Sequence, residues 1–222
     1  MEDIAAYGGK LEFLTWDGIF LHSFNLHQTK ENFRTPDEGI EEVAEAVKLV
    51  KDQYPEFEMI PLPNLPNWDV KDAEGNTVPH NAGNNSAPEK ANATWNELCD
   101  LFLEKMANKG VTNPINFIEI DHPFNYYTKG RETSKQRVQA IKDYCTENNL
   151  ELMVIVNTAV SGMGQEETDA QFKESCLQYL DYLREDGIDP QYIDVESWYP
   201  YPQYLVPETK ENSFTNVIRD LG

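Results

Sequence analysis

The sequence predicts an α/β fold, a TIM-type (β/α) barrel that is partial or lacks its first strands. Three observations predict it. Strand-like and helix-like segments alternate five times, two strands separate apolar from acidic residues, and long loops follow strands rather than helices. A complete barrel needs eight strands and usually about 250 residues. The chain has 222, so we expect one domain over residues 1–222, with the C-terminal part of a longer barrel as one interpretation. An open, doubly wound sheet is the alternative.

Five segments read as strands because they are apolar, contain β-branched or aromatic residues, and lie between polar or turn-forming residues. They are Lys10–Trp16, Phe57–Asn64, Asn116–Pro123, Leu150–Ala159 and Gln191–Pro200. The prolines of the second segment predict that this strand runs out near Pro61. The fourth is the clearest strand, an apolar run between polar flanks.

Five helices follow these strands in order. They are Pro36–Tyr54, Ala93–Gly110, Arg131–Asn149, Glu167–Gly187 and a last helix from Ser213. The first opens with proline and acidic residues, which is typical of a helix start. The second and fourth end at glycine, the usual helix stop. Regular alternation of this kind favours parallel strands with helices packed outside them.

Two strands show the same division between their faces. In "FIEID", Ile118 and Ile120 share one face while Glu119 and Asp121 share the other, because side chains alternate along a strand. "YIDVESW" repeats the division, with Asp194 and Glu196 on the acidic face. A sheet covered by helices on both faces would not carry such acids. The division favours a barrel whose acids point toward its axis.

Long loops follow the strands at Leu65–Ala91, Pro123–Gly130, Val160–Glu166 and Tyr199–Asn212, whereas the loop Lys109–Pro114 after a helix is short. In barrels and open α/β sheets, ligands bind at the carboxyl ends of the strands. The residues that carry chemistry are therefore expected at those ends.

Composition excludes several classes of partner. The chain has 18 basic and 39 acidic residues, a formal net charge of −21. Binders of nucleic acid and of anionic lipid need basic surfaces, so we expect neither nucleic acid nor a membrane as partner. The acidity spread along the chain is compatible with a secreted protein, so we expect a secreted or cell-surface location. The sequence itself begins Met1-Glu2-Asp3 and shows no signal peptide. The oligomeric state stays open.

Three carboxylates at strand ends are candidates for catalysis: Asp17, Asp121 and Glu196. A pair of carboxyl groups is the minimum apparatus for hydrolysing a glycosidic bond. Asp121 and Glu196 come from separate strands, so they could face each other across an opening. The alternative is that such acids bind basic or backbone donors and only stabilise the fold.

Aromatic and amide side chains near the same ends are typical of a carbohydrate cleft, because aromatic rings stack on sugar rings and amides bind hydroxyl groups. The candidates for substrate binding are Trp16, Asn64, His122, Tyr126, Asn157, Trp198 and Tyr199. The alternative is that each aromatic side chain only packs a rigid loop.

Glu119, Asp121 and His122 could also be read as metal ligands together with Glu196. Asp121 and His122 are adjacent, however, so as strand residues they point to opposite faces. We therefore expect no metal. We also expect no cofactor, because no GxGxxG, P-loop, HExxH or GxSxG motif is present.

The segments "IEIDHP", "VIVNT" and "DVESWYPYPQYLVPET" resemble the second half of a (β/α)-barrel glycoside hydrolase of the clan-A-like superfamily. The resemblance covers roughly Leu11 to the end and implies a retaining mechanism with two glutamates, the first often preceded by asparagine. Here no Asn-Glu pair ends a strand, and Glu196 is the only strong glutamate at a strand end. The resemblance implies a glycan substrate. The alternatives are a metal-dependent sugar isomerase or phosphodiesterase, and a non-catalytic glycan-binding protein.

Overall fold

The computed structural model describes residues 6–10, 12–23, 34–81, 92–157, 168–197 and 200–222. Seven α-helices and seven β-strands lie within these ranges. The strands are β1 (Phe13–Asp17), β2 (Glu58–Leu62), β3 (Val70–Lys71), β4 (Thr77–Val78), β5 (Phe117–Ile120), β6 (Glu151–Val156) and β7 (Tyr192–Val195). The helices are α2 (Ile19–Ser23), α3 (Pro36–Gln53), α5 (Trp95–Asn108), α6 (Phe124–Lys129), α7 (Arg131–Glu147), α8 (Asp169–Glu185) and α9 (Phe214–Leu221). The short 3₁₀ helix η1 spans Leu65–Asn67.

The strands form small sheets rather than one. β1 pairs in parallel with β2, and β5, β6 and β7 form a parallel three-stranded sheet in that order. An isolated parallel bridge between Asn64 and Asp121 links the two sheets just past the ends of β2 and β5. β3 and β4 form a separate antiparallel pair. The parallel strands thus follow one another in sequence order.

The predicted barrel is wrong. In the described part of the chain the sheets hold two or three strands each, and none closes on itself. β1 and β7 each pair on one side only among the described residues. Closure requires enough tilted strands to turn a full circle, and the five parallel strands do not. The α/β alternation is confirmed, because each predicted strand overlaps an observed one.

The five predicted helices begin at, or within two residues of, their predicted starts. Thr35 caps α3 in a capping box with Glu38, and Thr94 caps α5 in the same way with Glu97. Each box satisfies backbone N–H groups that the first helical turn leaves unpaired. The β3–β4 pair and α6 lie inside segments predicted as loops, because two-residue strands and a six-residue helix carry too little periodicity to recognise.

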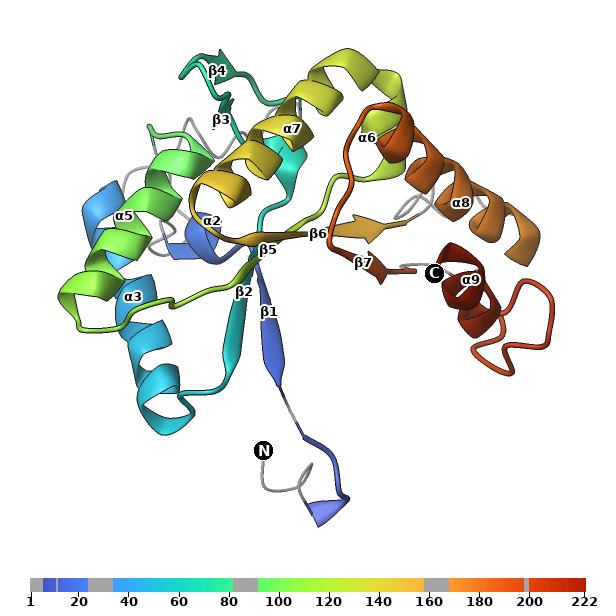
Figure 1. Cartoon of the computed structure of the whole chain (residues 1–222), viewed down its shortest axis with the longest axis horizontal. Coiled ribbons are helices and arrows are strands. Elements are labelled where there is room, and N and C mark those ends of the chain that lie inside the picture. The colour runs from blue at the N-terminus through green and yellow to red at the C-terminus, as the bar shows by residue number, and fades with distance from the viewer. Residues whose placement is uncertain (1–5, 11, 24–33, 82–91, 158–167, 198–199) are drawn as a thin grey trace.

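The hydrophobic core lies between the helices and one face of the parallel strands. Ile118 and Ile120 of β5 are fully buried members of it, and Ile193 and Val195 of β7 pack against it. This confirms the apolar half of the predicted division. Figure 1 shows α3, α5, α7 and α8 arranged in an arc around the outside of the strands. The acidic residues of β5 and β7 therefore face away from these helices.

None of the described helices has both the length and the apolar character that a membrane span requires.

Candidate functional site: a carboxyl cluster at the strand ends

The candidate site is built around Asp121, which follows β5 at the junction of the two sheets. The Asp121 N–H donates to Pro63 O at 3.1 Å, and Leu65 N–H donates to Asp121 O at 2.8 Å. These bonds extend the pairing of β2 and β5 beyond the strands themselves. Pro61, Pro63 and Pro66 cannot donate to a ladder, so regular pairing ends here. The backbone of Asp121 is consequently fixed on both sides.

A chain of two amides holds one oxygen of Asp121. Asn64 Nδ2 donates to Asp121 Oδ2 at 2.8 Å, and Asn67 Nδ2 donates to Asn64 Oδ1 at 2.8 Å. The other oxygen, Oδ1, is buried and has no hydrogen-bond partner among the described residues. The side chain is therefore oriented through one oxygen while the second stays available.

The environment of Asp121 favours its protonated form. The residue is 3% exposed, and burial raises the pKa of its carboxyl from 3.8 to about 7. The negative charge of Glu196 raises the pKa further, and Asp17 does so to a smaller extent, while the hydrogen bond from Asn64 lowers it. Desolvation disfavours the charged form, and nearby like charges add to the effect. Asp121 thus titrates near neutral pH.

Glu119 lies two residues earlier on the same face of β5 and is a second buried acid. It is 1% exposed, and Thr15 Oγ1 donates to its Oε2 at 2.7 Å across from β1. Burial raises the pKa of Glu119 to about 7, opposed by the Thr15 hydrogen bond and aided by Asp194 and Glu196. From the sequence, Glu119 is expected on the acidic face of its strand and as an alternative metal ligand. Its position two residues before Asp121 was the signal in the sequence that it belongs to the same carboxyl cluster, because alternate residues of a strand share a face.

Glu196 reaches the cluster from β7. Its N–H donates to Val156 O at 3.2 Å, so the pairing of β6 and β7 continues one residue beyond the end of β7. The side chain is half-buried, whereas Asp17 and Asp194 are exposed. The charge of Glu196 acts on both Glu119 and Asp121, which places it near both. Of the predicted site residues, the structure therefore brings together Asp17, Asp121, Glu196 and Asn64, and it adds Glu119 and Asp194.

The two buried acids are held by neutral donors. Within the described ranges, neither Glu119 nor Asp121 forms an ion pair with lysine or arginine. A carboxyl group buried without a cation keeps its proton more readily than one in a salt bridge. This cluster can accordingly hold protons at a pH where exposed acids have lost them.

Three of the other predicted residues lie in different surroundings. His122 is fully buried on the helix side, with its ring against Tyr127 at 5.8 Å between centroids. Asn157 is buried and accepts the Phe124 N–H at 3.2 Å through Oδ1, which orients the start of α6. Trp16 alternates with Thr15 and Asp17, so it faces the helices and lines a cavity with Ile19 and His22.

The remaining aromatic candidates are not brought to the cluster by any described contact. Tyr126 is on α6 and is 38% exposed. Trp198 and Tyr199 lie outside the described residues. Among the residues that the structure does describe, no group of three or more histidine, cysteine, aspartate or glutamate side chains could hold a metal ion.

A scan against protein-family models found no match to the chain, and a search of curated proteins also found none. The chemical interpretation therefore depends on the geometry of the cluster.

Proposed function

We propose that the chain is a carbohydrate-active enzyme that hydrolyses a glycosidic bond in an oligosaccharide or polysaccharide. Asp121 and Glu196 are its paired carboxyl groups. The observation that carries the proposal is the buried Asp121 carboxyl, whose pKa of about 7 is raised by burial and by the charge of Glu196. Hydrolysis of a glycoside needs one carboxyl that keeps its proton near neutral pH and a second that is ionised.

The surroundings of Asp121 support the role of general acid. Asn64 binds Oδ2, so Oδ1 is the oxygen available to carry the proton. That proton passes to the glycosidic oxygen as its bond to the anomeric carbon breaks. Glu196 then either activates a water molecule or bonds to the anomeric carbon itself, and these two courses invert or retain its configuration. Asp17 is the third carboxylate of the proposal.

Glu119 has a supporting role in this proposal. Its protonated form adds no charge beside Asp121, which keeps the pKa of Asp121 from rising further. The predicted stacking platforms for sugar rings remain Tyr126, Trp198 and Tyr199. A secreted or cell-surface location suits an enzyme acting on a polysaccharide. The absence of a described ion pair at Glu119 and Asp121 favours chemistry over a purely architectural role, since architectural acids are usually paired.

The test is an activity assay with nitrophenyl glycosides and natural polysaccharides, followed by the variants Asp121→Asn and Glu196→Gln. We expect either substitution to lower kcat by a factor of about 10² to 10⁴, the usual effect of losing an acid–base group. The matched control is Glu151→Gln, because Glu151 is an exposed acid at the opposite end of β6. It should leave kcat unchanged.

Three results would contradict the proposal. Full activity in Asp121→Asn would remove Asp121 as the acid. Sugar binding without turnover in the wild-type protein would favour a glycan-binding protein. Activity that is lost with a chelator and restored by Mg²⁺ or Mn²⁺ would favour a metal-dependent enzyme instead.

A further inference from the structure

Arg137, on α7, is a buried arginine whose charge has no described acidic partner in contact. It is 0% exposed, and its only described hydrogen bond runs from Nη1 to Asn81 Oδ1 at 3.0 Å. Its Nε and Nη2 atoms are buried and have no hydrogen-bond partner among the described residues. Buried donors are nearly always satisfied by protein, water or a bound ion, and an unpaired buried charge is strongly unfavourable.

The two free nitrogens are on the same edge of the guanidinium group. Nε–H and one Nη2–H point in parallel, so this edge can bind the two oxygens of a carboxylate or phosphate group at once. Arg131, on the same helix, shows that arrangement within the protein. Its Nε donates to Asp186 Oδ2 at 3.0 Å and its Nη2 to Asp186 Oδ1 at 3.1 Å. Arg137 presents the same edge without the carboxylate.

The surroundings of Arg137 suit an anion. His122 is also 0% exposed, and neither of its ring nitrogens has a described hydrogen-bond partner. Burial, and secondarily the charge of Arg137, lower the pKa of His122 to about 3, so its ring is neutral and carries one N–H. Asp69 is the acid whose charge acts on Arg137, but its Oδ1 is bound by His80 at 2.7 Å.

Asn81, which accepts the hydrogen bond from Arg137 Nη1, connects this buried side chain to the surface. Asn81 is exposed, and its backbone N–H donates to Pro66 O at 3.1 Å, which holds the residue in place. The guanidinium is therefore bonded to a residue at the surface, and Asp69, not an acid of the carboxyl cluster, is the charge that acts on it.

We propose that the free edge of Arg137 binds a small oxyanion, with His122 as a further donor, at a site separate from the carboxyl cluster. The shared chemistry is a pair of coplanar oxygens on one anionic group, as in carboxylate, sulfate or phosphate. This site is independent of the proposed glycoside hydrolysis.

The test measures Tm of the full chain in sodium phosphate, sodium sulfate and sodium acetate against sodium chloride at equal ionic strength. We expect a saturating rise in Tm of about 5 °C or more with an anion that binds, since a ligand of the native state stabilises it. A response to phosphate and sulfate alone identifies a tetrahedral anion, and a response to acetate identifies a carboxylate. Equal Tm in all four salts would overturn the proposal.

Three variants locate the effect. Arg137→Met should abolish the rise of Tm with anion. Arg131→Met should lower Tm but leave its rise with anion unchanged. Asn81→Asp places a carboxylate against Nη1 and neutralises the charge of the guanidinium, so it should raise Tm without added anion and weaken the response of the Nε–Nη2 edge to anions. If Arg137→Met does not fold, Asn81→Asp alone decides. An anion response that is unchanged in Asn81→Asp would contradict the proposal.

Discussion

The buried carboxyl groups of Glu119, on β5, and of Asp121, just after it, make the folded chain less stable as pH rises. The pKa of Asp121 is raised from 3.8 to about 7 in the folded chain. Between these values the native state holds a proton that the unfolded chain has already lost. Stability is therefore highest below about pH 4 as far as this group is concerned, and falls as pH rises to about 7. Glu119 contributes in the same direction.

Asp121→Asn should remove the contribution of this group, because the amide is neutral and of nearly the same size. We expect the variant to have a higher Tm than the wild-type protein at pH 8 and a similar Tm near pH 4. The difference in free energy of unfolding at pH 8 corresponds to a few kcal/mol. Thermal melts across this range measure it, and Asp189→Asn, at an exposed loop position, is the control. An unchanged slope of Tm with pH would show that Asp121 is ionised throughout.

Asn64 lowers the pKa of Asp121 through its hydrogen bond to Oδ2, against the larger effects of burial and of the Glu196 charge. Asn64→Ala removes a donor that favours the charged form, so the pKa of Asp121 should rise by about 1 unit. A pH titration followed by the ¹³C signal of the Asp121 carboxyl measures the change. Asn67→Ala is the matched control, since Asn67 contacts Asn64 and not Asp121. Its effect should be smaller, and a lowered pKa in Asn64→Ala would contradict the role assigned to Asn64.

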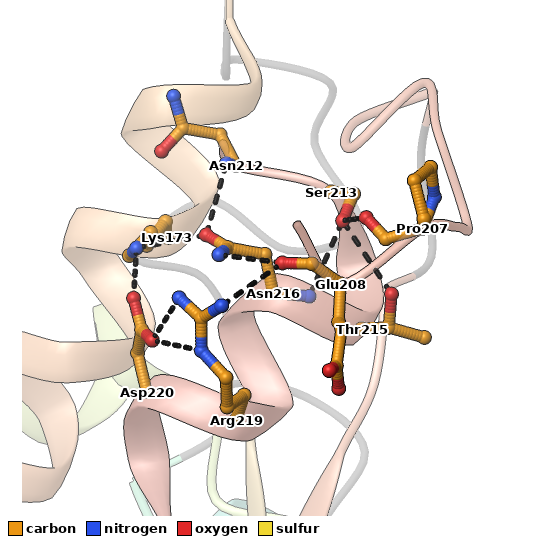
Figure 2. Close-up of polar contacts among 9 residues, drawn as sticks. All are labelled: Lys173, Pro207, Glu208, Asn212, Ser213, Thr215, Asn216, Arg219 and Asp220. Atoms are coloured by element: carbon orange, nitrogen blue, oxygen red, sulfur yellow. Dashed lines mark hydrogen bonds and ion pairs between the residues drawn. The ribbon is translucent and has the colours of Figure 1, made fainter. Parts of the chain in front are cut away.

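At the scale of elements, one side chain holds the C-terminal helix in place. Figure 2 shows Asn216 of α9 at the centre of a polar network that joins α8, the segment before α9 and the helix itself. Its Oδ1 accepts from Lys173 Nζ at 2.9 Å and from the Asn212 N–H at 3.0 Å. Its Nδ2 donates to Glu208 O at 2.9 Å. Asn216 is 4% exposed, so none of these bonds is readily replaced by water.

Asn216→Ala should lower the free energy of unfolding by about 2 to 3 kcal/mol, because it leaves buried donors and acceptors unpaired. Denaturation in urea measures the loss. The matched control is Thr215→Ala, whose side-chain oxygen has one long contact, 3.5 Å to Ser213 Oγ. That variant should change stability by less than about 0.5 kcal/mol, because the half-buried Thr215 side chain makes no other described hydrogen bond. Equal losses in the two variants would show that the network adds nothing specific.

At the scale of the whole molecule, charge opposes compactness. With a formal net charge of −21, the folded chain concentrates like charges that the unfolded chain keeps further apart. Added salt screens this repulsion over distances beyond the Debye length. In most of the described ion pairs at least one partner is exposed, so the stability that they lose to screening is small.

Raising sodium chloride from about 20 mM to about 500 mM should therefore increase Tm by several degrees, because the Debye length shortens to a few ångströms. The same ionic strength reached with another monovalent salt is the control for specific ion effects. A Tm that falls with salt would mean that attractive ion pairs outweigh the general repulsion.

Sequence alone determined the order and type of the main elements and the sidedness of the strands. Apolar residues at every second position of β5 and β7 require burial against helices, whatever the rest of the fold does. Asp121 and Glu196 follow the carboxyl ends of β5 and β7. Parallel strands bring their carboxyl ends to the same edge of a sheet, so the two acids were expected on the same side.

Only the tertiary structure decided closure and the protonation of the acids. Periodicity reports which face of a strand is buried, but not how many neighbours a sheet has, and the barrel prediction was wrong for that reason. The raised pKa of Asp121 depends on burial contributed by several elements and on a charge 75 residues away at Glu196, neither of which a local pattern encodes. The exposed or buried state of Trp16, His122 and Asn157 was likewise decided by packing, because strand-end residues can face either side.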